Sequence, residues 1–329
     1  MTSIAHIGYG YWGRNLARNF AELGALTAVV DPDPRAAESA ASTLGVRAAS
    51  FDDVLSDAGI QGVSIASPAE QHFAHAKAAL EAGKHVFVEK PLALDVGQAE
   101  ELGALAAKRG LTLMVGHLLQ YHPIYIKLRE MVAAGELGRL HYVYSNRLSL
   151  GKFRREENVL WSFAPHDLSM ILGLFDAEPT HVSAQGSVAY TPGVADVATV
   201  EMHFPGGGSG HVFTSWMHPF KEQRLVVIGE KAMAVFEDSL PDWDAKLQIY
   251  RHSIDTKGPV PNPAKADPEK VAVPRSEPLK AECQHFIDCI DSGARSRTDS
   301  AEGLRVLRVL EKAENALRDN LRQQGRAGA

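Results

Sequence analysis

Two adjacent ionisable side chains, Glu89 and Lys90, follow the apolar run of residues 86–88. A glycine turn precedes this run and Pro91 follows it, which predicts a short strand that ends at the two charged residues. In an open parallel sheet, ligands bind just beyond the carboxyl ends of the strands. An amine in that position could handle the proton of a ligand hydroxyl during its oxidation. Lys90 is therefore the first catalytic candidate, and a solvated lysine is the competing interpretation.

A second catalytic candidate is His166, which directly follows Pro165. Proline is typical of the first position of a helix, so we expect a helix to begin there with His166 in its first turn. Histidine changes its charge near neutral pH and can act as an acid or a base. Asp167, and Tyr121 in the ring-rich linker 116–123, are candidate substrate contacts.

A basic segment lies upstream of His166 and contains Lys152, Arg154 and Arg155, with Asn158 shortly after. One interpretation is a solvated basic loop. The other is a clamp for an anionic substrate, since a forked guanidinium suits phosphate oxygens. On the second interpretation these four residues contact the substrate.

Gly8, Gly10 and Gly13 form a G-x-G-x-x-G pattern between an apolar run at residues 3–8 and a helical run. In this context the pattern predicts a dinucleotide-binding turn. The first glycine permits the turn, the second allows a pyrophosphate to approach the backbone, and the third allows close packing of helix and strand. Free amides at the helix start face the anion. The expected cofactor contacts are Gly8, Tyr9, Gly10, Tyr11, Trp12, Gly13, Asp31, Ser67, Pro68, His72, Glu89 and Lys90.

Asp31 ends the next predicted strand, where an acid accepts a hydrogen bond from a ribose 2′-hydroxyl and repels a 2′-phosphate. This favours NAD over NADP. Arg35 is the nearest cation, so some tolerance of NADP stays open.

Metal binding is not expected. His72 and His75 are spaced for one helix face, but no further ligands with suitable spacing accompany them. The chain has two cysteines, Cys283 and Cys289, whose spacing in a helical pattern places them on different faces. We therefore expect no disulfide and a cytoplasmic location.

The elements expected up to residue 120 alternate between strands and helices, which predicts a doubly wound parallel sheet. We assign residues 1–120 to a Rossmann domain that binds NAD. Residues 121–329 form a second domain for substrate binding and oligomerisation, in which long strands of period two predict a mostly antiparallel open sheet. The fold class is α/β with a second α+β domain. Its expected strands cover 140–147, 181–190, 197–204, 210–217, 223–229 and 232–236, with closing helices at 278–291 and 300–321.

The bulk composition is that of a globular protein of 329 residues with a formal net charge of −6. Binding to phosphates of nucleic acid needs a basic face, so nucleic acid is not expected as the main partner. No run reaches the length of a membrane span, and the start lacks the basic and apolar regions of a signal peptide.

These segments together resemble the glucose–fructose oxidoreductase/inositol dehydrogenase family. The resemblance is carried by the glycine turn, the segment from Ser67 to His72, residues 82–86 and the Glu89-Lys90-Pro91 sequence, and it covers most of the chain. It implies a Rossmann domain followed by an α/β domain whose open sheet is often used for oligomerisation. It also implies that Lys90 is the active-site lysine and that His166 matches the second-domain histidine. Many members have an aspartate where this chain has Ser162.

A narrower resemblance, carried by residues 145–152, 156–158 and 161–167, is to the branch that includes UDP-N-acetylglucosamine 3-dehydrogenases. It implies oxidation of a ring hydroxyl, at C3, of a UDP-sugar. The alternatives are a free sugar, an inositol-like polyol or a UDP-sugar uronate as substrate. A non-catalytic sensor of NAD or a nucleotide sugar is a further alternative on the same fold. We expect a homodimer or homotetramer through the second sheet.

Overall fold

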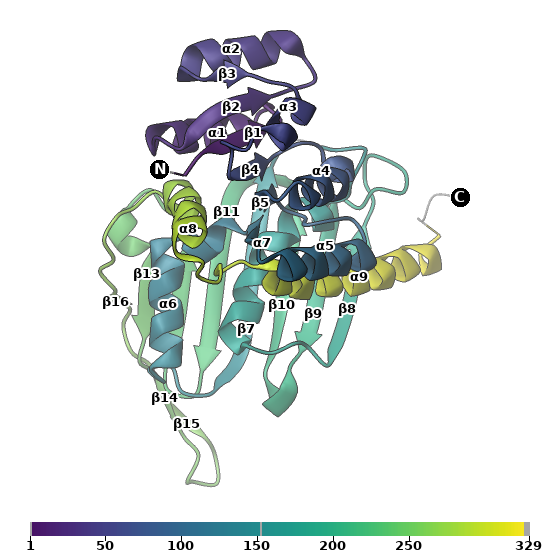
Figure 1. The fold of residues 1–329 in the computed structure, drawn as a ribbon. Helices are drawn as coiled ribbons and strands as arrows, with labels where there is room; N and C mark the ends of the chain where they lie inside the picture. The colour runs from purple at the N-terminus through teal and green to yellow at the C-terminus, as the bar shows by residue number, and fades with distance from the viewer. Residues whose placement is uncertain (1, 152, 326–329) are drawn as a thin grey trace. The chain divides into compact units, whose positions relative to one another are not determined.

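A computed structural model describes residues 2–151 and 153–325 of the chain (Figure 1). The chain divides into two compact units. The first comprises the N-terminal part of the chain through Tyr121 together with Glu277–Leu307, and the second comprises His122–Ser276 together with the C-terminal part from Arg308. The predicted second domain comprises all of 121–329. The observed division differs because residues 277–307 return to the first unit.

The first unit contains a six-stranded sheet in the order β3-β2-β1-β4-β5-β6. Every neighbouring pair is parallel, which confirms the predicted doubly wound sheet. Helices α1, α2 and α8 form one group and α4 and α5 form another (Figure 1). The strands are β1 (Ile4–Ile7), β2 (Leu26–Val30), β3 (Arg47–Ala48), β4 (Gly62–Ile65), β5 (His85–Glu89) and β6 (Leu113–Gly116). The helices are α1 (Gly13–Glu22), α2 (Pro34–Leu44), α3 (Phe51–Ser56), α4 (Ala69–Glu81), α5 (Val96–Arg109), η1 (Leu118–Tyr121) and α8 (Pro278–Ser292).

Three phenylalanine rings explain why α8 belongs to the first unit. Phe20 of α1, Phe87 of β5 and Phe286 of α8 are fully buried, and their ring centroids lie 5.9 to 6.3 Å apart in edge-to-face geometry. Each such ring removes a large apolar area from water, and edge-to-face pairs add to that gain. The α8 helix therefore completes a core that α1 and β5 begin.

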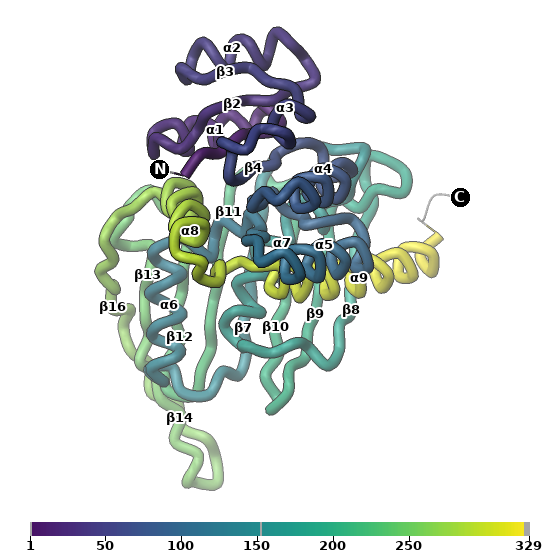
Figure 2. Tube along the Cα trace, viewed as in Figure 1, coloured from purple at the N-terminus to yellow at the C-terminus, as the bar shows by residue number. Residues whose placement is uncertain are grey.

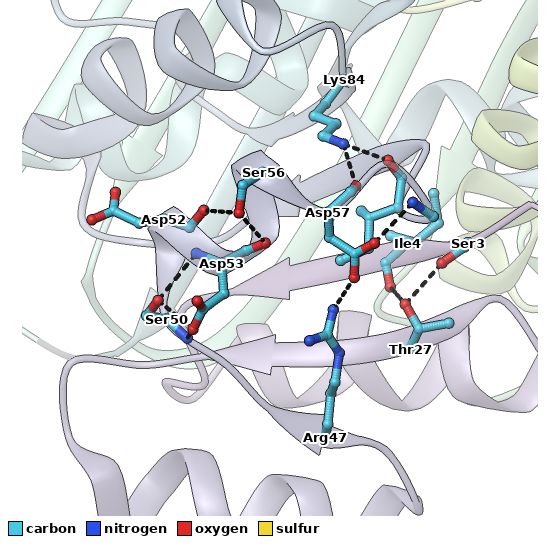
Figure 3. Close-up of polar contacts among 12 residues, drawn as sticks. Ser3, Ile4, Thr27, Arg47, Ser50, Asp52, Asp53, Ser56, Asp57 and Lys84 are labelled. Atoms are coloured by element: carbon cyan, nitrogen blue, oxygen red, sulfur yellow. Dashed lines mark hydrogen bonds and ion pairs between the residues drawn. The ribbon is translucent and has the colours of Figure 1, made fainter.

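The amino-terminal edge of this sheet is held by polar contacts (Figure 3). The Lys84 ammonium, immediately before β5, donates to the carbonyls of Asp57 and Ile60 at 2.6 and 2.8 Å. The carboxylate of Asp57 in turn pairs with Arg47. The two lysines that flank β5 thus differ in their surroundings. The Lys84 amine binds backbone carbonyls at one end, and Lys90 follows the strand at the end where ligands bind.

The second unit contains an eight-stranded sheet in the order β16-β13-β12-β11-β7-β10-β9-β8. Neighbouring strands are antiparallel except for β10 and β7, which are parallel, so the prediction of a mostly antiparallel sheet is confirmed. The β14–β15 hairpin forms a separate two-stranded sheet and extends away from the larger one (Figure 2). The strands are β7 (Leu140–Leu150), β8 (His181–Ser187), β9 (Val197–His203), β10 (Ser209–Ser215), β11 (Met217–Gly229), β12 (Met233–Glu237), β13 (Leu247–Tyr250), β14 (Ser253–Asp255), β15 (Asn262–Ala264) and β16 (Glu269–Lys270).

Helices α6 (Pro123–Ala133) and α7 (Val159–Phe175) pack on the second sheet, α7 against β7, β9 and β10 and α6 against β12. Two short turns, η2 (Pro205–Gly207) and η3 (Trp243–Ala245), also belong to the second unit. The last helix, α9 (Ser300–Gln323), belongs to the first unit through Leu307 and to the second unit from Arg308. None of the helices among the described residues is both long and apolar enough to cross a membrane.

The start of α7 differs from the prediction that a helix begins at Pro165. The helix starts at Val159, because the Asn158 side chain accepts hydrogen bonds from the amides of Leu160 and Trp161. Such a cap satisfies amides that have no partner within the helix. Pro165 therefore lies inside α7, and His166 is not in its first turn.

Glu282 of α8 offers a test of the first unit's core. Its carboxyl is fully buried, and neither oxygen has a hydrogen-bond partner among the described residues. Burial raises the pKa of Glu282 well above its ordinary value of 4.5, and the nearby Glu89 and Glu302 raise it further. The folded protein therefore holds this group as a neutral acid at a pH where the unfolded chain ionises it.

Replacement of Glu282 by Gln should stabilise the protein at neutral pH. Above pH 4.5 the unfolded wild-type chain loses a proton that the folded state keeps, so wild-type stability falls by up to about 1.4 kcal/mol per pH unit until the folded pKa is reached. The Glu282→Gln variant lacks this loss. Urea unfolding from pH 4 to 8 should show a stability difference that is constant below the unfolded pKa and grows above it. A difference that does not change with pH would contradict the neutral carboxyl.

Candidate active site

The turn after β1 has the backbone that a dinucleotide-binding loop requires. Gly8 has a φ of +92°, and a Cβ there would lie 2.7 Å from the Ala66 carbonyl oxygen, so only glycine fits without strain. The His6 side chain of β1 contacts the backbone of this turn. Burial lowers the pKa of His6 to about 4, so the ring is neutral at pH 7. Its Nε2 lies 2.9 Å from the Gly8 oxygen and its Nδ1 lies 3.2 Å from the Ser64 hydroxyl.

The other two glycines of the loop have different surroundings. A Cβ on Gly13 would lie 1.9 Å from the Gly8 oxygen, so Gly13 is needed for the loop to pack on its own helix. A Cβ on Gly10 would have no described atom within 4 Å. The space beside Gly10 therefore lies outside the protein's own packing. Helix α1 begins there without a side-chain cap at Trp12 and without an acid in its first turn, which favours a bound anion.

Asp31 lies directly after β2 and faces the same loop. Its Oδ2 accepts a hydrogen bond from the Tyr9 amide at 2.7 Å, and its Oδ1 accepts one from the Asp33 amide at 2.9 Å. A carboxylate offers about four acceptor positions. Asp31 can thus fix the loop and still accept from a ligand hydroxyl.

The loop is bonded to the end of β5 through Trp12 and Glu89. The indole Nε1 of Trp12 donates to Glu89 Oε1 at 2.5 Å, and the Lys90 amide donates to Glu89 Oε2 at 3.3 Å. The Glu89 side chain is buried, which raises the pKa of its carboxyl, while Trp12 and the charge of Lys90 act in the opposite direction. A Cβ on Gly116 would lie 3.0 Å from the Glu89 carboxyl, so that glycine leaves room for it. Lys90 itself is half-buried.

His72 connects the ends of two neighbouring strands. Its Nδ1 lies 2.7 Å from the Pro91 oxygen and its Nε2 lies 2.9 Å from the Ser67 oxygen. Burial lowers the pKa of the His72 ring, and the charge of Lys90 lowers it further. Both ring nitrogens of His72 face backbone carbonyls, so this side chain holds the segments after β4 and β5. Ser67 contacts His75, with 3.0 Å between Oγ and Nδ1, and Pro68 precedes α4.

In the second unit, His166 is half-buried on α7, one turn after Ser162. The neighbouring Asp167 is 1 % exposed and accepts hydrogen bonds from Arg147 at 2.6 and 3.1 Å and from the Ser145 hydroxyl at 2.5 Å. Both oxygens of Asp167 therefore bind side chains of β7. This pair fixes α7, and with it His166, on the sheet.

In the basic segment between β7 and α7, acidic residues of the same segment pair with some of the basic residues. Lys152 lies outside the described residues. The Arg154 guanidinium pairs with Glu157 at 2.9 Å, and the Arg155 amide donates to the Glu156 carboxylate. No ion pair joins the Arg155 guanidinium to another residue within the described ranges 2–151 and 153–325. Arg155 is thus the better placed of the two for an anionic ligand.

Two further residues of the expected substrate set have structural contacts. Asn158 caps α7 through its Oδ1, and its Nδ2 donates to Glu314 at 2.8 Å. The Tyr121 ring is 2 % exposed, and its hydroxyl lies 3.0 Å from the Thr298 hydroxyl. Burial raises the pKa of Tyr121. Their polar atoms are therefore engaged within the protein.

Three supporting residues were missed by the sequence analysis: His6, Gly116 and Arg147 as the partner of Asp167. His6 sits at an inward position of β1, and a buried histidine in a strand before a glycine turn is a usable signal. Gly116 ends β6, the neighbour of β5, so its proximity to Glu89 follows from the strand order. Arg147 lies on β7, 20 positions before Asp167, and this separation gives no local signal of the pair.

Substitution of Gly10 should affect cofactor binding without affecting the stability of the fold. A Cβ at this position meets no described atom, so Gly10→Ala should leave the melting temperature of the ligand-free protein unchanged. The same Cβ occupies the space into which a pyrophosphate must come, so NAD affinity should fall about ten-fold or more. Calorimetric titration with NAD measures this. The matched variant Gly13→Ala should instead lower the melting temperature without any ligand. Unchanged NAD affinity in Gly10→Ala would place the dinucleotide elsewhere.

Two family descriptions match the chain, one for each unit. Residues 2–117 match the oxidoreductase family with an NAD-binding Rossmann fold, and residues 125–235 match the GFO/IDH/MocA C-terminal domain. Among curated relatives, UDP-N-acetylglucosamine 3-dehydrogenase of Acidithiobacillus ferrooxidans is 32% identical over 303 residues, which cover 92% of each chain. The NAD-dependent scyllo-inositol 2-dehydrogenase of Bacillus subtilis is 27% identical over 97% of this chain and 93% of its own.

The solved structures give the same family. A structure of the Acidithiobacillus ferrooxidans UDP-N-acetylglucosamine 3-dehydrogenase matches with a TM-score of 0.86 at 30% identity, covering 97% of this chain and 98% of that one. The match extends over both units, and so do the two family descriptions. The chain therefore belongs to the GFO/IDH/MocA oxidoreductase family, with an N-terminal NAD-binding Rossmann fold and the family's C-terminal domain.

Proposed function

We propose that this protein is an NAD-dependent dehydrogenase that oxidises a ring hydroxyl, at C3, of a nucleotide sugar such as UDP-N-acetylglucosamine to a keto sugar. The observation that carries the proposal is the Lys90 amine at the carboxyl end of β5, next to the Glu89 carboxyl that Trp12 of the dinucleotide loop binds. The similarity to UDP-N-acetylglucosamine 3-dehydrogenase over 92% of both chains supports the choice of substrate.

The residues of the first unit fit a dinucleotide. The open space beside Gly10 and the uncapped amides of α1 suit the pyrophosphate, and Asp31 has acceptor positions left for a ribose hydroxyl. The same Asp31 carboxylate would repel a 2′-phosphate, which favours NAD over NADP. When bound, NAD supplies the hydride acceptor.

The proton of the hydroxyl is the task of the protein's own residues. We assign it to Lys90 or His166, and whichever of them does not take the proton donates a hydrogen bond to the developing carbonyl oxygen. Asp167 is a positioning residue for His166, because its bonds to Arg147 and Ser145 fix α7. Glu89 has the same relation to Lys90, since its carboxyl accepts from the Lys90 amide.

Arg155 is the proposed contact for the substrate's diphosphate, with Arg154 and Lys152 beside it in sequence. A forked guanidinium binds phosphate oxygens through two parallel hydrogen bonds. The Asn158 and Tyr121 side chains support the site from within the protein, since Glu314 and Thr298 already bind them.

A polyol dehydrogenase is the second candidate function. The scyllo-inositol 2-dehydrogenase of Bacillus subtilis aligns with 97% of this chain. An unphosphorylated polyol has no use for Arg155, so the two candidates differ in the role of the basic segment.

We further propose that the protein forms a homodimer or homotetramer through its second sheet. The rings of Tyr142 and Tyr144 on β7 and of His211 on β10 are half-buried, while Val143 between the two tyrosines is fully buried. Tyr144 and His211 stack at 5.2 Å between centroids, and the Tyr142 hydroxyl lies 2.6 Å from His211 Nδ1. An array of ordered rings on a half-exposed face suits a protein interface.

A substrate panel tests the proposed function. We expect NADH formation, followed at 340 nm, with UDP-N-acetylglucosamine and NAD, and a much lower kcat/KM with free N-acetylglucosamine, myo-inositol or scyllo-inositol. The reason is that these compounds lack the nucleotide, whose binding to the enzyme lowers KM and so raises kcat/KM. NADP should replace NAD poorly because of Asp31. Efficient oxidation of an inositol, with no oxidation of any UDP-sugar, would favour the second candidate. A protein that only senses NAD would form no NADH with any of these compounds.

Lys90→Ala should lower kcat while leaving NAD affinity intact. Loss of a positioned acid–base group costs roughly a hundred- to ten-thousand-fold in rate. The proposed pyrophosphate and ribose contacts lie apart from Lys90, in the glycine loop and at Asp31. The matched control is Lys77→Ala, which removes a half-buried lysine of α4 that pairs with Glu101 of α5. Steady-state kinetics and a parallel NAD titration measure both effects. A kcat equal to that of the wild type would remove Lys90 from the mechanism.

A further inference from the structure

The strand ends of the second sheet bring three loops together at one edge. Leu148 of β7 pairs with Ser215 of β10, Ser215 pairs with Val197 of β9, and Val197 pairs with Ser187 of β8. These four residues form one row across the sheet. The segments that follow β7, β8 and β10 therefore start next to one another, and the first of them leads directly into α7.

Each of these three segments carries an aromatic residue: Phe153 after β7, Tyr190 after β8 and Trp216 after β10. The Phe153 and Tyr190 rings meet edge to face, with 5.0 Å between centroids, and Phe153 lies 5.7 Å from the Trp216 ring. Trp216 is fully buried, Phe153 is 38% exposed and Tyr190 is 66% exposed. The three rings thus run from the core to the surface.

The loop that holds Tyr190 is fixed by a buried acid. Asp196 is 1% exposed; its Oδ1 accepts from the Trp216 indole at 2.6 Å. Its Oδ2 accepts from the amides of Ala189 and Tyr190 at 2.7 and 3.0 Å. A buried carboxylate therefore fixes the backbone at Tyr190, while most of the Tyr190 side chain is exposed to solvent. A fixed backbone at Tyr190, together with the contact of its ring with Phe153, lowers the ordering cost of stacking a ligand there.

The neighbouring charges indicate what stacks there. Arg154 and Arg155 directly follow Phe153, and consecutive residues lie about 3.8 Å apart along the backbone. A nucleoside diphosphate places a flat base and two phosphates within a few such steps of each other. Base stacking on an aromatic ring is favourable for any base, and phosphates favour guanidinium groups.

We infer that Phe153 and Tyr190 form the surface on which the nucleobase of a nucleotide-sugar substrate stacks, with Arg155 binding the diphosphate. This inference rests on the proposed function and adds to it the residues that recognise the nucleotide. The relevant ligand class is a nucleoside diphosphate joined to a sugar. A free sugar or a polyol has neither a base to stack on these rings nor a phosphate to bind Arg155.

Binding of two probes to the full chain in the presence of NAD tests the inference. Calorimetric titration with UDP and with pyrophosphate separates the base from the phosphates. Tyr190→Ala should weaken UDP binding roughly 5- to 150-fold, the equivalent of about 1–3 kcal/mol per stacked base, and leave pyrophosphate binding unchanged. Arg155→Ala should weaken both probes. The matched control Tyr190→Phe keeps the ring and should keep the UDP affinity of the wild type.

Kinetics give a second readout. With UDP-N-acetylglucosamine, Tyr190→Ala should raise KM and leave kcat unchanged, because stacking of a remote base is equal in the ground state and the transition state. The melting temperature of each ligand-free variant reports on folding, and Tyr190→Ala should match the wild type, since most of the ring is exposed.

Three results would overturn the inference: no UDP binding by the wild type, equal UDP affinity in wild type and Tyr190→Ala, or an equal loss of UDP and pyrophosphate in that variant. Failure of the proposed function looks different. If the wild type turns over UDP-N-acetylglucosamine and Tyr190→Ala changes neither UDP affinity nor KM, only the inference is wrong. If UDP binds through Tyr190 and no sugar is oxidised, only the proposed oxidation is wrong.

Discussion

The hydrogen bond from the Trp12 indole to the buried carboxyl of Glu89 joins the loop after β1 to the end of β5, a strand that is not adjacent to β1. In the order β3-β2-β1-β4-β5-β6, β4 lies between β1 and β5, so the bond crosses above β4. His72 bridges the ends of β4 and β5 in the same region. The glycine turn, the end of β4 and Lys90 are consequently held as one assembly. Such an assembly can keep an amine in a fixed place while the ligands around it exchange.

The second unit positions its chemistry by a different means. Helix α7 carries His166, and its place on the sheet is fixed by a buried charge pair, Arg147 with Asp167, together with the cap that Asn158 provides. A buried pair of this kind loses hydration, and that loss is offset only when the remaining hydrogen bonds are made. Here Ser145 supplies the additional bond. The polar residues around His166 thus orient helix α7 on the sheet. This role explains why several of them bond to other residues of the protein and not to solvent.

Local patterns were sufficient to predict much of the first unit. The glycine spacing, the apolar runs and the strand–helix alternation predict the parallel sheet and the position of Lys90 at its carboxyl edge. The start of α7 was not predicted correctly, because Pro165 suggested a helix start and the capping role of Asn158 was overlooked. The partners of Tyr121 and Asp167 could not be read from local spacing. Thr298 lies 177 positions from Tyr121, and only the fold brings such residues together. The return of residues 277–307 to the first unit is non-local in the same way.

That return has a consequence for how the chain is made. Phe286 and its neighbours on α8 cover Phe20 and Phe87, which belong to the first hundred residues of the chain. A ribosome must therefore synthesise most of the polypeptide before the N-terminal sheet can complete its core. Domains generally fold as units and in the order of synthesis. Until α8 is synthesised, Phe20 and Phe87 lack the side chains that cover them in the folded unit, and transiently exposed apolar surface of this kind favours aggregation and chaperone binding.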